Sequence, residues 1–135
     1  MKVLGIMIII YIVLVLVLLI FSFQFLMIAS AKKSKGIKLK GLQGKLTSLE
    51  KNGSRGLVYF FSPGCRACKY QTPIIKELQS SYKNIFDVDI SRDLQTARVF
   101  GIKATPTTIF VENGVVKQVL LGVKQKEDLK SYLLK

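Results

Sequence analysis

The sequence begins with a long apolar run that sets its N-terminal part apart from the rest of the chain. From Val3 to Phe21 there is no charged residue, and only Gly5 and Tyr11 interrupt the run, which continues to Ala29. As a helix, a segment of this length spans about 40 Å at roughly 1.5 Å per residue. The core of a bilayer is about 30 Å thick and needs about 20 residues. The run therefore predicts one transmembrane anchor over residues 3–29, in contact with membrane lipid.

A cleaved signal peptide is the alternative interpretation of the same run. Ala29-Ser30-Ala31 is an A-x-A pattern that would permit cleavage after Ala31. The apolar core of a signal peptide usually has only about 7–15 residues, however, and is preceded by a basic region. Here that region consists of Lys2 and the amino terminus. We favour an uncleaved anchor and leave cleavage open.

The segment that follows the run, residues 30–41, is strongly basic. It contains five lysines and no acidic residue. This composition predicts a polar, flexible linker that lies near anionic lipid headgroups, or equally a solvated linker without lipid preference.

The remaining residues, 42–135, are enough for one small domain. They carry 15 Lys and Arg against 8 Asp and Glu, a net charge of +7. The basic residues are scattered singly, with no Arg-rich run and no interleaved aromatic residues, so we do not expect nucleic-acid binding. We expect a monomer.

Histidine is absent from the whole sequence, which excludes several kinds of site. Ser-His-Asp and Cys-His catalysis and HExxH zinc sites all need it within one chain. The only two cysteines, Cys65 and Cys68, cannot complete a structural zinc site of four ligands. We therefore expect neither a metal nor a cofactor.

Residues 42–135 alternate between helical and strand patterns. Apolar periodicity, β-branched runs and turn residues predict helices at 43–51, 65–82, 93–100 and 124–134, and strands at 56–62, 85–90, 107–112 and 115–121. Asn113-Gly114 predicts a two-residue hairpin turn between the last two strands. The alternating half favours parallel pairing and the hairpin antiparallel pairing, which predicts an α/β fold with a mixed central sheet flanked by helices.

The motif Cys65-Arg66-Ala67-Cys68, at the start of a helix that follows a central strand, resembles the redox site of the thioredoxin family. Pro73, the segment 100–114 and Gly122 match further positions of that family in order, and the resemblance covers residues 43–135. It implies a thioredoxin-like fold and a thiol–disulfide oxidoreductase that exchanges electrons with protein thiols and disulfides. It also implies a redox partner that recycles the cysteine pair.

The resemblance assigns roles to the site residues. Disulfide exchange needs a thiolate, and the N-terminal end of a helix stabilises an anion. Cys65 is therefore the expected nucleophile. Cys68, three residues on and close enough to form the Cys65–Cys68 disulfide, is the expected resolving cysteine. Arg66 and Ala67 would tune the redox potential. Pro106 would be a cis-proline beside the cysteines, and the backbone of Thr105 would pair with an extended substrate.

The sequence departs from the thioredoxin pattern at several of these positions. Gly64 replaces the tryptophan before the first cysteine, no proline lies between the cysteines, and Thr105 stands where the family usually has isoleucine. Tyr59 occupies the position of a buried aspartate, and we interpret it as an aromatic residue of the strand core. These departures leave open whether the protein is an oxidant, a reductant or an isomerase.

Other functions compete with the redox interpretation. The cysteines could be a permanent staple, but a loop this short stabilises little by loop entropy. A membrane-anchored binding or chaperone module without redox turnover is the main alternative. A dimer sharing an iron–sulfur cluster would need further ligands.

Membrane sidedness is predicted differently by two arguments. The lysines after the apolar run outweigh Lys2, so the positive-inside rule favours a cytoplasmic domain. Disulfides persist outside the cytoplasm, and many anchored thioredoxin-like proteins face outward. We expect the catalytic domain on the extracytoplasmic side.

Overall fold

The structure is a computed structural model that describes residues 2–134, apart from the side chains of residues 2, 27, 28 and 30–33. The chain divides into two compact units, one ending at Ser30 and the other beginning at Ala31. Each unit is described by itself below.

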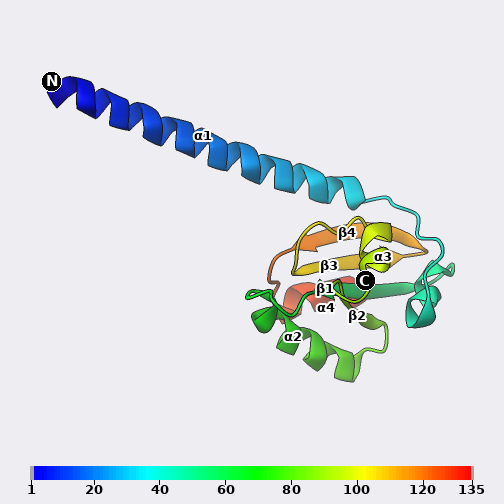
Figure 1. The fold of residues 1–135 in the computed structure, drawn as a ribbon. Helices are drawn as coiled ribbons and strands as arrows, with labels where there is room; N and C mark the ends of the chain where they lie inside the picture. Colours follow the sequence, from blue (N-terminus) through cyan, green and yellow to red (C-terminus); the bar gives the residue numbers. More distant parts are fainter. Residues whose placement is uncertain (1, 135) are drawn as a thin grey trace. The chain divides into compact units, whose positions relative to one another are not determined.

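The first unit is helical. Helix α1 (Lys2–Ser34) includes the predicted anchor, and its side chains are exposed from Val3 to Leu26 (Figure 1). Val3–Leu26 is long and apolar enough to cross a membrane, and a signal sequence would satisfy the same criteria. The predicted N-terminal apolar helix is confirmed.

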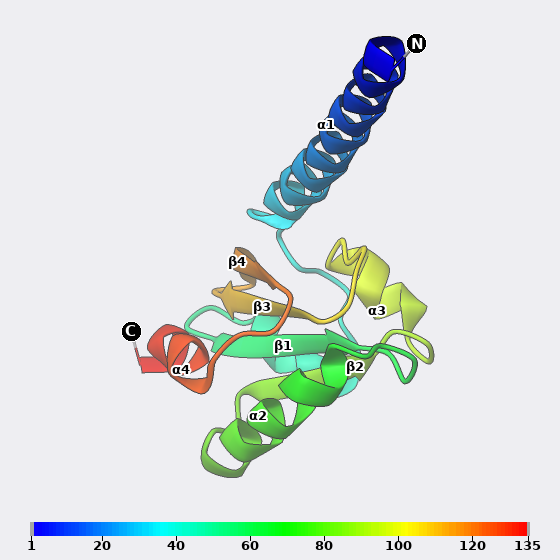
Figure 2. The ribbon, with the colours of Figure 1, turned by 90° about the vertical axis from the view of Figure 1, so that its left-hand side faces the viewer.

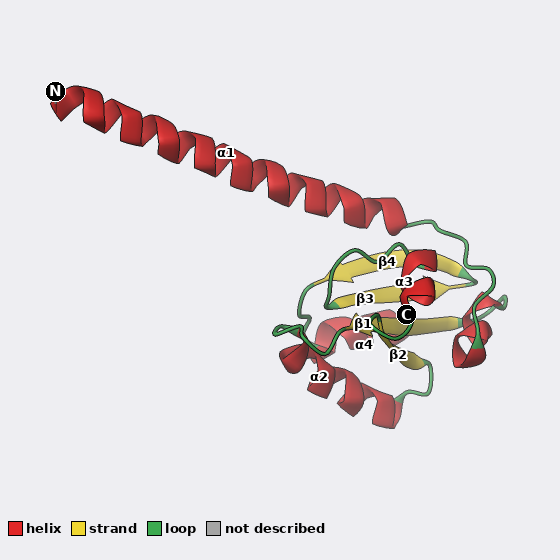
Figure 3. Cartoon of the chain, in the orientation of Figure 1, coloured by secondary structure: helices red, strands yellow, loops and turns green. Residues whose placement is uncertain are grey.

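The second unit is built on a sheet of four strands, in the order β2-β1-β3-β4 (Figure 3). Its strands are β1 (Arg55–Phe61), β2 (Ile85–Asp89), β3 (Thr107–Glu112) and β4 (Val115–Leu121). Strands β1 and β2 are parallel, whereas β3 pairs antiparallel with both β1 and β4. The predicted mixed α/β fold is confirmed. The continuous apolar run of β1 fits its central place, because that strand is covered on both faces.

Helices α2 (Cys68–Ser81) and α4 (Lys126–Leu134) cover one face of the sheet (Figure 2). Alternation along β1 sends Leu57 and Tyr59 into this layer, where they pack with Ile75, Leu78 and Leu129. The opposite face is covered by the short helix α3 (Leu94–Val99) and the 3₁₀-helix η1 (Gly44–Glu50). Two cores therefore fix β1 in place, and the redox motif follows directly from its C-terminal end.

Turn residues act as the sequence predicts. Asn113 and Gly114 have φ values of 53° and 71°, which suits a two-residue hairpin between right-twisted strands. The Asp93 carboxylate accepts the Thr96 N–H at 2.9 Å and caps α3. The first predicted helix forms as a 3₁₀-helix, with Leu46 and Leu49 buried.

The basic linker is the main difference from the predicted architecture. The N–H groups of Gly36 and Leu39 donate to the carbonyls of Val116 and Gly114 at 2.8 and 2.7 Å, and Val116 donates back to Ile37 at 3.0 Å. Ser34 is buried, and its hydroxyl donates to the Gly101 carbonyl at 3.1 Å.

The apolar residues of the linker explain this packing. Ile37, Leu39 and Leu42 are interspersed among the lysines, and Leu39 and Leu42 join the core under α3 and η1 with exposures of 2% and 7%. Lysines 38 and 40 point to solvent. From Ser34 on, the predicted flexible linker is therefore a part of the folded unit that lies along the edge of β4.

Candidate active site

The two cysteines lie in the connection between β1 and α2. The N–H of Cys65 donates to the Ser62 carbonyl at 3.1 Å, which closes a turn after the strand. Helix α2 begins at Cys68, so the predicted helix start at Cys65 is three residues early. Cys65, Arg66 and Ala67 form the turn that leads into the helix.

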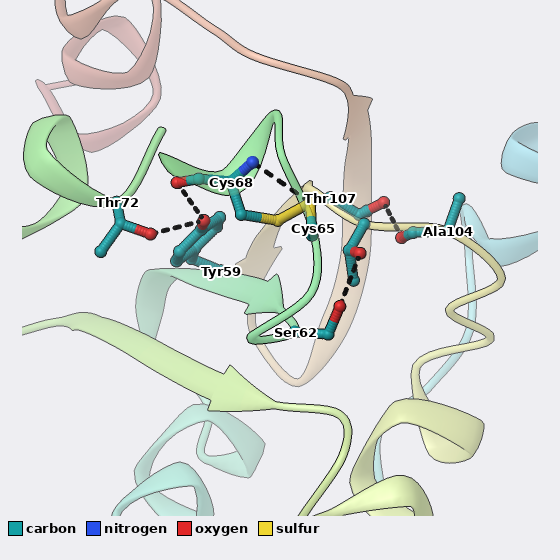
Figure 4. The surroundings of a disulfide bond; sticks show 8 residues. Tyr59, Ser62, Cys65, Cys68, Thr72, Ala104 and Thr107 are labelled. Carbon is teal, nitrogen blue, oxygen red and sulfur yellow. Dashed lines mark hydrogen bonds between the residues drawn. A yellow bond between two sulfur atoms is a disulfide. The ribbon is translucent and has the colours of Figure 1, made fainter. Parts of the chain in front are cut away.

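Cys65 and Cys68 form a disulfide, with their Cα atoms 5.3 Å apart (Figure 4). The two residues are not equally accessible, because Cys65 is partly exposed whereas Cys68 is 3% exposed. The N–H of Cys68, at the start of α2, donates to the Cys65 sulfur at 3.1 Å. A backbone donor at a helix N-terminus favours negative charge on the atom it faces. The N-terminus of α2 therefore faces the sulfur of Cys65, the more accessible of the two cysteines.

The loop before β3 lies beside the disulfide. The Thr105–Pro106 peptide bond is cis, and Pro106 is buried. The hydroxyl groups of Ser62 and Thr105 lie 3.4 Å apart, which joins this loop to the turn that carries Cys65 (Figure 4). The N–H of Gly122, whose φ is 74°, donates to the Pro106 carbonyl at 2.9 Å. Pro106 is therefore fixed by β3, which begins at the next residue, and by the hydrogen bond from Gly122, the residue after β4.

Comparison with known proteins shows the family to which the chain belongs. The sequence model named Thioredoxin matches residues 46–135. The chain belongs to the thioredoxin family. It is 35% identical over 83 residues to a thioredoxin of Rickettsia conorii, covering 58% of this chain and 78% of that protein. It is 30% identical over 87 residues to a thioredoxin of Bacillus subtilis, covering 61% and 84%.

Solved structures agree on the fold. The thioredoxin Mala s 13 of Malassezia sympodialis superposes with a TM-score of 0.56 at 20% identity, over 66% of this chain and 80% of that one. Thioredoxins are thiol–disulfide oxidoreductases, and this thioredoxin-family chain carries the required cysteine pair. It is an enzyme of that class.

The structure brings most of the predicted site residues of this thioredoxin-family protein together. Cys65 and Cys68 form the disulfide, Thr105 contacts Ser62 in the turn that leads to Cys65 and precedes the cis Pro106, and Arg66, which is exposed, follows Cys65. Among the residues that the structure describes, no group of three or more Cys, Asp or Glu side chains could hold a metal ion. The roles given to the individual residues remain proposals.

Tyr59 lies directly under the start of α2, a contact that the sequence did not predict. Its side chain is fully buried, in agreement with its interpretation as a core residue. The carbonyl of Cys68 can only accept, so the Tyr59 hydroxyl donates to it at 3.4 Å, while the Thr72 hydroxyl, 3.0 Å away, donates to Tyr59 (Figure 4). Burial raises the pKa of Tyr59, and the hydrogen bond from Thr72 only partly opposes this. A neutral hydroxyl thus ties β1 to the first turn of α2.

Removing this hydroxyl in Tyr59→Phe is expected to lower the free energy of unfolding by about 1 kcal/mol, the usual net value of one hydrogen-bonding group. Because the folded-state pKa is raised, the contribution is complete below the ordinary tyrosine pKa of about 10 and is lost as the pH rises above that value. Urea unfolding of both proteins at pH 7 and pH 9 should therefore give the same difference. The matched control is Tyr70→Phe, because Tyr70 is 73% exposed and should not respond. An equally large loss in the control would contradict the assignment.

Proposed function

We propose that the chain is a membrane-tethered thiol–disulfide oxidoreductase that acts on protein substrates through Cys65 and Cys68. The observation that carries the proposal is the asymmetry of the pair: Cys65 is partly exposed with a backbone N–H at its sulfur, and Cys68 is buried behind it. An attacking thiolate must be accessible, whereas a resolving thiol needs only to reach its neighbour.

The reaction proceeds in two exchanges. In the reducing direction, the Cys65 thiolate attacks one sulfur of a substrate disulfide, that bond breaks, and the other substrate sulfur leaves as a thiolate that takes a proton from water. Cys68 then loses its proton and attacks the Cys65 sulfur, which releases the second substrate thiolate and forms the Cys65–Cys68 disulfide. The enzyme loses two electrons and the Cys68 proton, and the substrate gains two electrons and two protons, the first from water and the second when the released thiolate takes up the proton that Cys68 lost. The reverse sequence oxidises a substrate dithiol.

The neighbouring residues have supporting roles in this proposal. The backbone of Thr105, beside Pro106, pairs with the extended substrate segment around the target cysteine. Arg66 and Ala67 tune the redox potential from between the cysteines. A separate redox partner restores the cysteine pair after each turnover, and the enzyme works as a monomer without a cofactor.

The tether is the apolar part of α1, which contacts membrane lipid and is retained in the mature protein. Its support is the length and composition of Val3–Leu26, which suit a bilayer core of about 30 Å. We place the catalytic domain on the extracytoplasmic side, where substrate disulfides persist, although the lysines that follow the helix favour the opposite orientation.

Expression of the full chain in a bacterial host tests the tether. The protein should remain in the membrane pellet after alkaline extraction, and its mass should include residues 1–31. After mild reduction of whole cells, a membrane-impermeant thiol reagent should label Cys65. If the mature protein instead began at Lys32, the apolar run would be a cleaved signal peptide and not an anchor. Labelling only after lysis would contradict the proposed orientation.

As a control, Leu14→Arg combined with Leu18→Arg should abolish membrane retention, since each arginine costs roughly 2.5–3.5 kcal/mol at the centre of a spanning helix.

A further inference from the structure

A shallow groove lies beside the disulfide, between the end of β1 and the first turns of α2. Its volume is about 340 Å³, and its walls include both cysteines together with Phe61, Pro63, Lys69 and Pro73. Phe61, Pro63 and Pro73 make most of this surface apolar. A groove of this kind suits an apolar side chain that is held next to the reacting sulfur.

The groove is distinct from the surface around Pro106. Neither Thr105 nor Pro106 is among its lining residues. Thr72, which lines the groove, lies on one side of the disulfide, whereas Ala104 and Thr107 lie on the other (Figure 4). A substrate segment that pairs with Thr105 on one side of the cysteines could therefore place a neighbouring residue in the groove on the other side.

The charge at the groove is positive. Lys69 is the only charged side chain among the described lining residues, and Arg66 is exposed in the adjoining turn. The acidic side chains of α2 and β2 have partners of their own: Glu77 pairs with Lys126, Asp87 accepts from Gln79 at 2.7 Å, and Asp89 accepts from Ser91. Lys69 and Arg66 therefore offer their charge to a ligand at the mouth of the groove.

A second cavity, of about 210 Å³, shares Phe61 and Thr72 with the groove and lies further along α2. Its walls include Asp87 as well as Lys76. An acidic ligand group is disfavoured beside Asp87, so the favourable place for one is the end of the groove near the cysteines.

We propose that this groove selects substrates in which an apolar residue and an acidic residue lie next to the target cysteine. The apolar side chain packs against Phe61, Pro63 and Pro73, and the carboxylate faces Lys69 and Arg66. The inference rests on the proposed function, because the groove contacts the residues next to the target cysteine only when the substrate is joined to Cys65. It names the substrate class that the cysteine pair alone does not define.

The test compares the rates at which the reduced full chain, in an uncharged detergent, reduces disulfide-linked peptide dimers. One peptide carries Phe and Glu next to its cysteine, a second carries Phe and Lys, and a third carries Ser and Glu. The first should react roughly three to ten times faster than the second and at least about twice as fast as the third, the range expected for a partly exposed ion pair and a half-buried side chain. Hydroxyethyl disulfide, a small neutral substrate, is measured in parallel.

Two variants distinguish an effect of the groove from an effect of the overall positive charge of the protein. Lys69→Gln should reduce the preference for Glu over Lys to below about twofold, whereas Lys117→Gln, the same change at an exposed position of β4, should leave it intact. Lys117→Gln should reduce hydroxyethyl disulfide at the wild-type rate, and the peptide rates of each protein are divided by its own rate with hydroxyethyl disulfide, so that a general effect of Lys69→Gln on the cysteine pair cancels. Equal rates for the three peptides, or an equal effect of the two variants, would overturn the inference while the proposed function stands. Failure of the wild type to reduce hydroxyethyl disulfide would instead overturn the proposed function and the groove with it.

Discussion

Cys65→Ser is expected to reduce disulfide exchange to the uncatalysed rate. The serine hydroxyl has nearly the shape of the thiol but is not ionised near neutral pH, so no nucleophile remains at the exposed position of the site. Cys68, at 3% exposure, is too buried to replace it. The measurement is the rate at which the full chain catalyses reduction of a protein disulfide by dithiothreitol.

Cys68→Ser is the matched control for this prediction. It keeps the attacking sulfur and the N–H of residue 68 that faces it, so it should form a mixed disulfide with the substrate in one stoichiometric step. Turnover should stop there, because no second sulfur can release the substrate. Retained turnover in Cys65→Ser, or mixed-disulfide formation by Cys65→Ser and not by Cys68→Ser, would reverse the two roles.

Leu39→Ala is expected to lower the free energy of unfolding by about 2–5 kcal/mol, the usual cost of truncating a buried leucine. Leu39 lies in the basic segment, yet it is 2% exposed and packs in the core that includes Phe100 and Val116. Its N–H also donates to the Gly114 carbonyl, so the truncated side chain leaves a cavity beside a fixed backbone. Urea unfolding of the oxidised protein, followed by tyrosine fluorescence, measures the change.

The control for Leu39→Ala is Lys38→Ala, one residue earlier. Lys38 is exposed, and alanine keeps the backbone that bridges to Val115, so the free energy of unfolding should change by less than about 0.5 kcal/mol. If both substitutions had the same small effect, the segment would be a solvated linker after all. A large effect of Leu39→Ala alone would show that the folded unit begins before Leu42.

The sequence predicted the fold well where one local pattern decided the structure. The apolar run of β1, the acidic alternation of β2 and the Asn113-Gly114 turn each allow one conformation, and the strands formed within one residue of their predicted ends. The prediction of a flexible linker over residues 30–41 was wrong from Ser34 on, because the lysines dominate the composition of this segment. Only Ile37 and Leu39, which alternate with exposed lysines, indicated a buried strand-like segment. These residues are buried only because the segment lies along the edge of β4, and the sequence of the segment does not reveal that pairing.

The candidate site was predictable as a set of residues but not as a geometry. The spacing of Cys65 and Cys68 and the resemblance around Pro106 identified its members. The asymmetry in exposure, the Ser62–Thr105 contact and the position of Tyr59 under Cys68 depend on how the turn, the loop and β1 meet in space. The signal that could have indicated Tyr59 was its place in the strand before the motif, six residues ahead of Cys65.

The reduction potential of the Cys65–Cys68 pair tests the central claim most directly. The full chain would be equilibrated with thiol–disulfide buffers of defined potential, and the reduced fraction would be read from the mass added by thiol alkylation. Our account predicts a two-electron transition with a midpoint between about −270 and −120 mV, the range of thioredoxin-fold catalysts from reductant to oxidant. A midpoint below about −300 mV, typical of structural disulfides, would contradict it and would leave a binding module with a permanent staple.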